Sequence, residues 1–242
     1  PMSIGPENIL ILTGAGISAE SGLGTFRDKG GLWEKFDPEA LATPEGFKRD
    51  PERVLDFYNA RRKNLIGAEP NPAHRALAEL EQAWLMAGRG EFLLVTQNID
   101  DLHEQAGSAQ LLHMHGELLK TRCQLCGHLF TDKADITVDR PCPGCGKAGG
   151  LRPHVVWFGE MPLGLDQIYQ ALEQVDLFVA VGTSGTVYPA AGFVQEARAA
   201  GAWTLELTLE PGEVSGLFDE HHHGPASEVV PAWVTRKLET GA

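Results

Sequence analysis

The sequence predicts an α/β protein built on a parallel β-sheet. Short apolar runs alternate along the chain with segments of helical spacing, which is typical of parallel strands joined by helical crossovers. Three of these runs, 8–12, 92–96 and 177–181, end directly in glycine or polar residues. Two segments, about 23–70 and about 118–154, do not follow this alternation, and we expect them to build a smaller second domain.

The individual elements follow from local patterns. A helix is expected from Pro51, because the polar start at Asp50-Pro51 suits a helix entrance. Another is expected from Pro72, because Leu77, Leu80 and Trp84 recur at helical spacing. The expected strands are 8–12, 92–96, 111–115, 177–181 and 203–208, and the expected helices are 51–66, 72–84, 166–174, 192–200 and 230–238. Residues 123–150 should form a loop-rich insert.

Composition limits the function classes. The chain has 242 residues, 43% hydrophobic and 22% charged, which indicates a globular protein of one large domain or a large and a small one. Lys and Arg number 20 against 33 Asp and Glu, and a net charge of −13 argues against nucleic-acid binding. We see no signal peptide and no apolar run of the ~18 residues that a membrane helix needs. We therefore expect a cytoplasmic monomer that does not bind membranes.

A glycine-rich turn follows the first expected strand. Gly14-Ala15-Gly16-Ile17-Ser18-Ala19 matches G-x-G-x-x-A, whose glycines allow the backbone to approach a pyrophosphate. The alternative interpretation is a plain tight turn. An ordinary dinucleotide motif continues with a helix, a second strand and an acidic residue ~20 positions on. Here the chain instead enters Gly22–Asp28, so we expect an unusual loop over the nucleotide site.

Polar side chains follow two further strands. Thr96–Asp101 (T-Q-N-I-D-D) comes at the end of the second strong strand, and Gly182-Thr183-Ser184 follows a third. Residues at the carboxyl ends of parallel strands point into the crevice where open α/β sheets bind ligands. The alternative for the Asn and Asp residues is a helix N-cap. The agreement of three strand ends favours a ligand site at one edge of the sheet.

Four cysteines predict a metal site. Cys123-x-x-Cys126 and Cys142-x-x-Cys145 each offer two thiolates from one turn, and four thiolates close a tetrahedral Zn²⁺ site. Because the set contains no open position, the zinc should be structural. The alternative, a pair of redox disulfides, fits poorly with two such units in one small insert.

The histidines show no metal-ligand spacing like that of the cysteine pairs. His115 lies in His113-Met114-His115-Gly116, and alone such a residue is more often a packed histidine than a catalytic base. His74 is expected to be structural. We interpret His221-His222-His223 as a solvated stretch before Gly224-Pro225, not as a set of metal ligands.

These motifs together resemble the sirtuins, a family of NAD-dependent protein lysine deacylases. The resemblance covers about residues 8–238. It rests on Gly14–Ser18, Thr25-Phe26-Arg27, Gln97–Asp100, His115-Gly116, the two Cys-x-x-Cys pairs, Phe158-Gly159-Glu160 and Gly182-Thr183-Ser184, in that order.

The resemblance implies a fold and an activity. It implies an α/β fold with a Rossmann-like NAD-binding domain over 1–30, 71–117 and 155–242, and a small domain of helices and a zinc ribbon over 31–70 and 118–154. NAD and acyl-lysine would meet between the two domains. The acyl oxygen would attack C1′ of the nicotinamide ribose, and the products would be free lysine, nicotinamide and O-acyl-ADP-ribose. Acylated-lysine proteins would be the partners.

The resemblance also implies site residues. His115 would be the general base, and Asn98 and Asp100 would be catalytic beside it. The implied cofactor-binding residues are Gly14, Ala15, Gly16, Ser18, Thr25, Phe26, Arg27, Gln97, Asn98, Asp100, Gly182, Thr183, Ser184, Thr208 and Ala226. Val156, Trp157, Phe158, Gly159 and Glu160 would line the peptide groove. Thr208 stands where the family usually has Asn, which puts part of the hydrogen bonding to the adenosine ribose in doubt.

The acyl group is suggested by one helix face. Tyr58 and Arg61 are three residues apart and share a face, and on spacing alone we would interpret them as a solvent-exposed pair. The Tyr-x-x-Arg pattern, with the small Ala42, resembles bacterial sirtuins of the class III type that remove succinyl and malonyl groups. A preference for succinyl-lysine over acetyl-lysine is therefore expected, with acetyl still accepted. The alternatives are a plain NAD-dependent deacetylase, a non-catalytic NAD or ADP-ribose sensor, and a zinc-ribbon nucleic-acid module.

Overall fold

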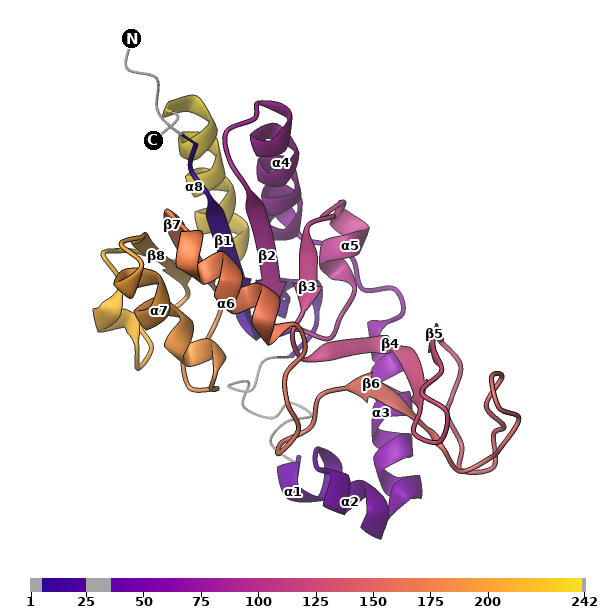
Figure 1. Ribbon diagram of the computed structural model, residues 1–242. Coiled ribbons are helices and arrows are strands. Elements are labelled where there is room, and N and C mark those ends of the chain that lie inside the picture. Colours follow the sequence, from indigo (N-terminus) through magenta and orange to yellow (C-terminus); the bar gives the residue numbers. More distant parts are fainter. Residues whose placement is uncertain (1–5, 25–35, 241–242) are drawn as a thin grey trace.

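The computed structural model describes residues 6–24 and 36–240, and its largest element is a parallel sheet (Figure 1). The sheet has six strands in the order β3-β2-β1-β7-β8-β9, all pairs parallel. The strands are β1 (Ile9–Thr13), β2 (Phe92–Thr96), β3 (Leu111–His113), β7 (Leu177–Val181), β8 (Trp203–Thr208) and β9 (Glu220–His223). The chain adds strands on one side of β1 and then on the other, so the order reverses between β1 and β7. Ligands of open α/β sheets bind outside the carboxyl ends of the strands at such a point.

Helices cover both faces of this sheet (Figure 1). Alternate side chains of β1 explain why: Ile9 and Ile11 pack toward α4 (Pro72–Met86) and α8 (Ala226–Thr240). Leu10 and Leu12 pack toward α6 (Leu165–Gln174) and α7 (Phe193–Ala199). A strand buried on both faces is apolar throughout, which is the pattern seen in the sequence. The expected Rossmann-like α/β architecture is confirmed.

A second, smaller group of elements lies beside the carboxyl ends of these strands (Figure 1). It contains α1 (Pro38–Leu41), α2 (Pro44–Arg49) and α3 (Pro51–Leu65), together with an antiparallel sheet of β5 (Leu129–Thr131), β4 (Gly116–Cys123) and β6 (Leu151–Val155). Asp37, Thr43 and Asp50 are the N-caps of these three helices, and each helix begins with a proline. This order suits a helix start, because the capping side chain accepts hydrogen bonds from free backbone amides. Proline at the first position has no amide hydrogen that would need an acceptor.

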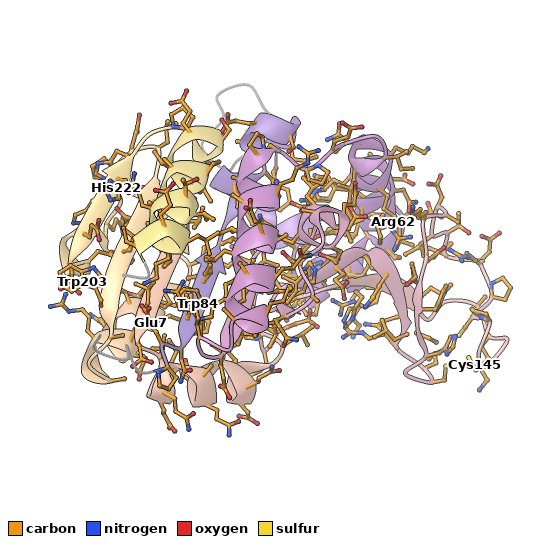
Figure 2. The ribbon with its side chains drawn as sticks, turned by 90° about the horizontal axis from the view of Figure 1, so that it is seen from above. Glu7, Arg62, Trp84, Cys145, Trp203 and His222 are labelled. Carbon is orange, nitrogen blue, oxygen red and sulfur yellow. The ribbon has the colours of Figure 1, made fainter. Side chains whose placement is uncertain are left out.

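Arg62 joins α3 to the small sheet. Its guanidinium is buried (Figure 2). It donates to the carbonyl oxygens of Leu118 (2.8 Å), Lys120 (3.0 Å) and Ala134 (2.7 Å), to the Thr121 hydroxyl (2.9 Å) and to the Asp132 carboxylate (3.4 Å). The planar fork of arginine suits so many acceptors at once. One side chain thus holds the helical part and the ribbon part of the smaller group together.

The structure differs from the sequence expectations in several elements. The described part of segment 23–70 contains three helices where one was expected, and the ribbon contains β4, β5 and β6. The short helix α5 (Leu102–Ala106) and the edge strand β9 were not expected either. Helix α8 begins at Ala226, before the expected residue 230, and contains Pro231. The domain boundaries stay a prediction. Within the described part of the chain, the helices lack the combination of length and apolar character that spanning a bilayer requires.

Candidate active site

A cavity of about 1350 Å³ opens at the carboxyl ends of the central strands. One wall is formed by the loops that follow β1, β2, β7 and β8, and the other by α3 and by the segment after β6. The cavity therefore lies where the strand order reverses, as the polar strand ends predicted. All expected cofactor and substrate residues line it except Thr25, Phe26 and Arg27, which lie outside the described residues.

The glycine-rich turn packs tightly against the end of β7. The Gly14 amide donates to the Val181 carbonyl (2.9 Å) and the Gly16 amide to the Gly182 carbonyl (2.8 Å). A Cβ atom on Gly16 would lie 2.7 Å from the Cα of Gly182, and Gly182 itself has a φ of +61°. These glycines are thus needed for the approach of two strand ends, a reason that the sequence motif alone did not reveal.

The turn continues as two short 3-10 segments, η1 (Ala15–Ile17) and η2 (Ala19–Ser21). The amides of Ile17 and Ser18 donate to the carbonyls of Gly14 (3.2 Å) and Ala15 (3.1 Å). Four amides of the turn are therefore already engaged within the protein. The Ala15 amide has no backbone acceptor among residues 6–24 and 36–240.

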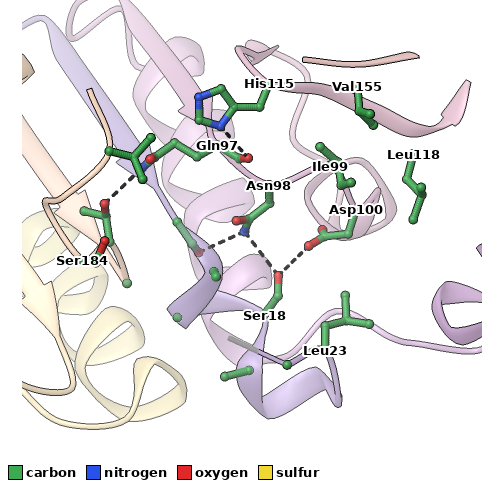
Figure 3. A pocket seen from close by; sticks show the side chains of 18 of the residues that line it. Ser18, Leu23, Gln97, Asn98, Ile99, Asp100, His115, Leu118, Val155 and Ser184 are labelled. Atoms are coloured by element: carbon green, nitrogen blue, oxygen red, sulfur yellow. Dashed lines mark hydrogen bonds between the residues drawn. The ribbon is translucent and has the colours of Figure 1, made fainter. Parts of the chain in front are cut away.

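Asn98 is held in place by a buried polar network (Figure 3). Its Nδ2 donates to the Gly14 carbonyl (3.0 Å) and lies 3.5 Å from Ser18 Oγ, and its backbone amide donates to Thr96 Oγ1 (3.0 Å). Ser18 Oγ in turn donates to Asp100 Oδ2 (2.9 Å). The network joins the turn after β1 to the loop after β2, so both are fixed relative to each other before any ligand binds.

Asp100 is a buried carboxylate in this network. Burial raises its pKa, and the hydrogen bonds from the Leu102 amide (3.1 Å) and from Ser18 oppose the shift only in part. An acid with a raised pKa inside a cavity is a frequent property of functional sites.

His115 lines the cavity, and the backbone holds one of its ring nitrogens. Its Nδ1 lies 3.1 Å from the carbonyl oxygen of Gln97 (Figure 3). A carbonyl can only accept, so Nδ1 carries the hydrogen and Nε2 keeps its lone pair. Burial lowers the pKa of His115, and the hydrogen bond to Gln97 offsets only part of this. The imidazole is therefore neutral at pH 7 and able to accept a proton.

The neighbouring His113 has the opposite state. Its Nδ1 lies 3.0 Å from the Asn98 carbonyl and its Nε2 3.0 Å from Glu104 Oε1, so both nitrogens donate. Burial alone would lower the pKa of His113, but the hydrogen bond and charge of Glu104, together with the Asn98 carbonyl and Glu117, raise it above its usual value. His113 is thus a charged structural residue, and the two histidines of the motif differ in role.

The remaining cofactor candidates lie along the ends of β7 and β8. Gln97 Nε2 donates to Thr183 Oγ1 (3.0 Å), which ties the loop after β2 to the loop after β7. Thr208 donates its hydroxyl hydrogen to the Glu210 carbonyl (2.9 Å). Its oxygen can still accept a hydrogen bond, but it cannot donate one to a ribose in this arrangement. Ala226 lies at the start of α8, where the Ser227 amide donates to Glu20 Oε1 (3.0 Å).

The acyl-group candidates lie at the α3 wall of the cavity. Tyr58 is 3% exposed, so its interpretation as a solvent-exposed residue is wrong. Its oxygen accepts from Trp157 Nε1 (2.9 Å), which leaves its own hydrogen available to a ligand. The Arg61 Cζ lies 5.9 Å from the centre of the Tyr58 ring and 5.7 Å from that of Phe57. Burial lowers the pKa of Arg61, against the opposing effects of Tyr58 and Asp100.

Glu160 also lines the cavity, but its carboxylate is engaged. It accepts two hydrogen bonds from Arg152, at 2.8 and 2.9 Å, and one from the Trp157 amide at 2.9 Å. The Cζ of Arg152 lies 3.6 Å from the centre of the Trp157 ring. Burial opposes ionisation of Glu160, but Arg152 outweighs it and lowers the pKa. Glu160 therefore positions the segment after β6, and Arg152 is a supporting residue that no sequence motif indicated.

The four cysteines meet at the far end of the small sheet (Figure 2, at Cys145). The Sγ atoms of Cys123 and Cys145 are 4.0 Å apart, and those of Cys126 and Cys142 are 3.7 Å apart. Tetrahedral thiolates with Zn–S bonds of about 2.3 Å lie about 3.8 Å apart, so the four atoms fit one structural zinc ion. All four sulfur atoms lie within 4.8 Å of one another, and the expected zinc site is confirmed in its geometry.

Fold and cavity together define an α/β enzyme that binds a nucleotide cofactor and carries a structural zinc. The family described as "Sir2 family" matches residues 14–189, and the chain belongs to this family. An NAD-dependent protein deacylase of Caulobacter vibrioides is 58% identical over 234 residues, covering 97% of this chain and 98% of that protein. The one from Escherichia coli strain K12 is 56% identical over 241 residues, covering 99% and 85%.

Solved structures of Sir2 homologues are also similar to this chain. A Sir2 homologue in complex with NAD is similar with a TM-score of 0.86 and 39% identity, covering 97% of this chain and 90% of that one. A Sir2 homologue in complex with ADP-ribose has a TM-score of 0.87 at 39% identity, covering 97% and 92%. The resemblance to the sirtuins is thus confirmed, and the activity of the chain is NAD-dependent protein deacylation.

Proposed function

We propose that this deacylase acts on lysines that carry short dicarboxylic acyl groups, succinyl and malonyl, in preference to acetyl-lysine, which it still accepts. The observation that carries the proposal is that Tyr58 and Arg61 line the same cavity as the neutral His115. The cavity can then hold a carboxylate at Tyr58 and Arg61 and perform the chemistry at His115.

The physical argument concerns the terminal carboxylate of the acyl group. Moving an ionised carboxylate from water into a largely apolar cavity is costly unless the protein supplies a partner. Arg61 can offer a forked, charge-assisted pair, and the Tyr58 hydroxyl can add a donor. Ala42 is buried in the hydrophobic cluster beside Tyr58, and its small side chain leaves room for the longer acyl chain.

Cofactor binding is proposed for the wall formed by the central strands. The Ala15 amide and the hydroxyls of Thr183 and Ser184 would hold phosphates and ribose, and Asn98 and Asp100 would surround the nicotinamide. NAD supplies the electrophilic C1′ of its ribose, with nicotinamide as the leaving group. The Sir2 homologue solved with NAD has this fold at 39% identity, which supports the assignment. Thr208 would accept a hydrogen bond at the adenosine end.

His115 is proposed as the general base. With Nδ1–H donated to the Gln97 carbonyl, Nε2 points its lone pair away from that bond and would accept a proton from a hydroxyl group in the cavity. Asn98 and Asp100 would orient the reacting groups, because the network through Ser18 restricts their motion.

The peptide is proposed to bind along the segment after β6. Val156, Trp157, Phe158 and Gly159 line the cavity there, and Glu160 holds the segment in place through Arg152. One similar structure, with a TM-score of 0.81 and 27% identity, is a complex of Sir2 with a deacetylated p53 peptide and 3′-O-acetyl-ADP-ribose. It supports acylated-lysine proteins as the partners. The cytoplasmic location and the monomeric state stay predictions.

The test compares acyl groups on one peptide in three variants on α3. In Arg61→Met, kcat/KM for succinyl-lysine should fall by about 10- to 100-fold, because a hydrogen bond to a charged group contributes ~1.5–3 kcal/mol. Deacetylation should change little. Arg61→Lys keeps the positive charge without the forked guanidinium, and its kcat/KM for succinyl-lysine should fall less than that of Arg61→Met. Arg53→Met removes an exposed arginine of the same helix and should leave both activities unchanged.

Two results would reject the acyl preference. One is an equal loss of both activities in Arg61→Met, and the other is a wild-type enzyme without desuccinylase activity. In either case the plain deacetylase would be the better interpretation.

A further inference from the structure

The run of three histidines lies on the edge strand β9, next to a buried carboxylate of β8. In the parallel pairing, Glu206 lies opposite His221, and Thr208 lies opposite His223. Successive side chains of a strand point to opposite faces, so Glu206, His221 and His223 share one face of the sheet. His222 belongs to the other face, where its Nε2 is 2.7 Å from Glu220 Oε1 (Figure 2). The stretch is thus an edge strand, and two of its histidines, His221 and His223, are exposed, as expected of a solvated segment.

The distances within this group are those of metal ligands. His221 Nδ1 lies 3.5 Å and His223 Nε2 lies 3.6 Å from the same oxygen, Glu206 Oε1. Such separations are too long for good hydrogen bonds. With Zn–N and Zn–O bonds of about 2.0–2.2 Å, the ligand atoms of a tetrahedral site lie about 3.3–3.6 Å apart. The three ligand atoms all lie within 4.8 Å of one another.

The carboxylate of Glu206 is buried beneath the two histidines. Its side chain is 2% exposed, and no lysine or arginine of residues 6–24 or 36–240 forms an ion pair with it. Its Oε1 accepts a hydrogen bond from Ser215 Oγ at 2.6 Å. A buried carboxylate without a lysine or arginine beside it is costly, and a divalent ion held together with the two histidines would supply positive charge. The Ser215 hydroxyl would orient the carboxylate as an outer-shell partner.

The histidines give such an ion a route to solvent. The side chains of His221 and His223 are 33% and 36% exposed, whereas the carboxylate lies beneath them. Imidazole suits Zn²⁺, and two histidines with one carboxylate leave a fourth position for water. We propose that Glu206, His221 and His223 bind one Zn²⁺, as a second metal site separate from the four cysteines.

The place of this site relates it to the cofactor cavity. Leu207 and Thr208, which follow Glu206, line the cavity, and so do Gly224 and Pro225, which follow His223. A zinc ion bound to both strands holds together the two strand ends that form this part of the cavity rim. Binding at the two sites would then be coupled, and any such coupling is reciprocal.

The experiment measures zinc stoichiometry in protein without an affinity tag. Wild-type protein is dialysed until only tightly bound metal remains and is then titrated with ZnCl₂ against a chromophoric chelator. The expected result is two equivalents per chain, the second weaker than the first. The double variant His221→Asn with His223→Asn should bind one equivalent, and Glu206→Gln should weaken the second by at least 10-fold. His222→Asn, on the other face, should keep both.

Cobalt spectra of the wild-type protein keep the test independent of variants that fold poorly. With zinc retained by the four cysteines, one added equivalent of Co²⁺ should give only weak d–d bands, because it binds the two histidines and the carboxylate. Wild-type protein that binds a single equivalent of metal in total would overturn the proposal. So would a folded double variant that keeps the second equivalent, or an added Co²⁺ that gives only the charge-transfer bands of thiolate ligands.

Discussion

Arg62 and its neighbour Lys63 allow a sharp test of how the smaller group of elements is held together. In Arg62→Met, the methylene stem is largely kept while the guanidinium is lost. Three backbone carbonyls, one hydroxyl and one carboxylate would then lose a donor. Asp132 would keep its hydrogen bond from Arg140 at 2.7 Å, so the carboxylate would not be left unpaired.

The expected loss follows from these contacts. A buried acceptor left without a partner costs ~1–3 kcal/mol, and breaking a buried ion pair costs ~3–5 kcal/mol. Because Asp132 keeps other partners, the cost of an unpaired charge does not apply, and we expect the carbonyls left without this donor to account for a loss of about 3–5 kcal/mol in total. That is a large share of the ~5–15 kcal/mol by which domains are stable.

Urea unfolding followed by circular dichroism gives the free energy of unfolding, with zinc held in slight excess. The matched control is Lys63→Met. Lys63 forms an ion pair with Asp135 at 3.4 Å, with side chains 70% and 48% exposed, and such pairs contribute ~0–1 kcal/mol. A loss below about 1 kcal/mol in Arg62→Met, or an equal loss in both variants, would refute the idea that buried acceptors determine the effect.

Three further predictions follow from the sites. Cys142→Ala should release the tightly bound zinc and destabilise the ribbon, since metal-binding energy is part of folding energy there; metal analysis with thermal unfolding measures both, and full zinc retention would contradict it. The fall of kcat/KM on the acid side should occur below pH 6.5, because burial lowers the pKa of His115 and only its neutral form accepts a proton. Activity should then be lost as the pH drops through the pKa of His115, and a pH–rate profile that already falls above pH 7 would be inconsistent with this. Gly16→Ala should raise the KM for NAD and destabilise by about 1–3 kcal/mol, because its Cβ would lie 2.7 Å from the Gly182 Cα. Gly216→Ala, where a Cβ meets nothing within 4 Å, is the control for that variant.

The central strands β1, β2 and β7 of the large sheet could be predicted because each is a nearly uninterrupted apolar run. Residues 92–96, 177–181 and 203–208 were expected as strands, and β2, β7 and β8 have these bounds. Parallel strands covered on both faces need apolar side chains throughout, so composition alone marks them. The cavity at their carboxyl ends was predictable for the same reason.

Elements without an apolar pattern could not be predicted. Strand β9 reads Glu-His-His-His, and it is recognised only through its pairing with β8. The helices α1 and α2 are four and six residues long and depend on caps by Asp37 and Thr43 rather than on helical periodicity. Short elements of this kind are stabilised by tertiary packing, which a local sequence window does not contain.

The zinc site and the role of His115 differ in how they could be found. Two Cys-x-x-Cys pairs carry their own spacing signal, so the ligand set followed directly from the sequence. His115 and His113 have the same local context, and only their partners separate them: a carbonyl alone for one, and a carbonyl with the Glu104 carboxylate for the other. The supporting pair of Arg152 and Glu160 likewise depends on contacts across a strand and a loop.

In the proposed function, this cavity couples the consumption of NAD to lysine deacylation through His115. The most direct test is to measure nicotinamide release and free lysine together on one succinyl-lysine peptide, in wild type and in His115→Ala. We expect one nicotinamide per lysine released in wild type. We also expect a loss of both products by about 10²–10⁴-fold in the variant, which should stay folded and still bind ADP-ribose. Deacylation without nicotinamide release, or wild-type turnover in His115→Ala at saturating NAD, would contradict it.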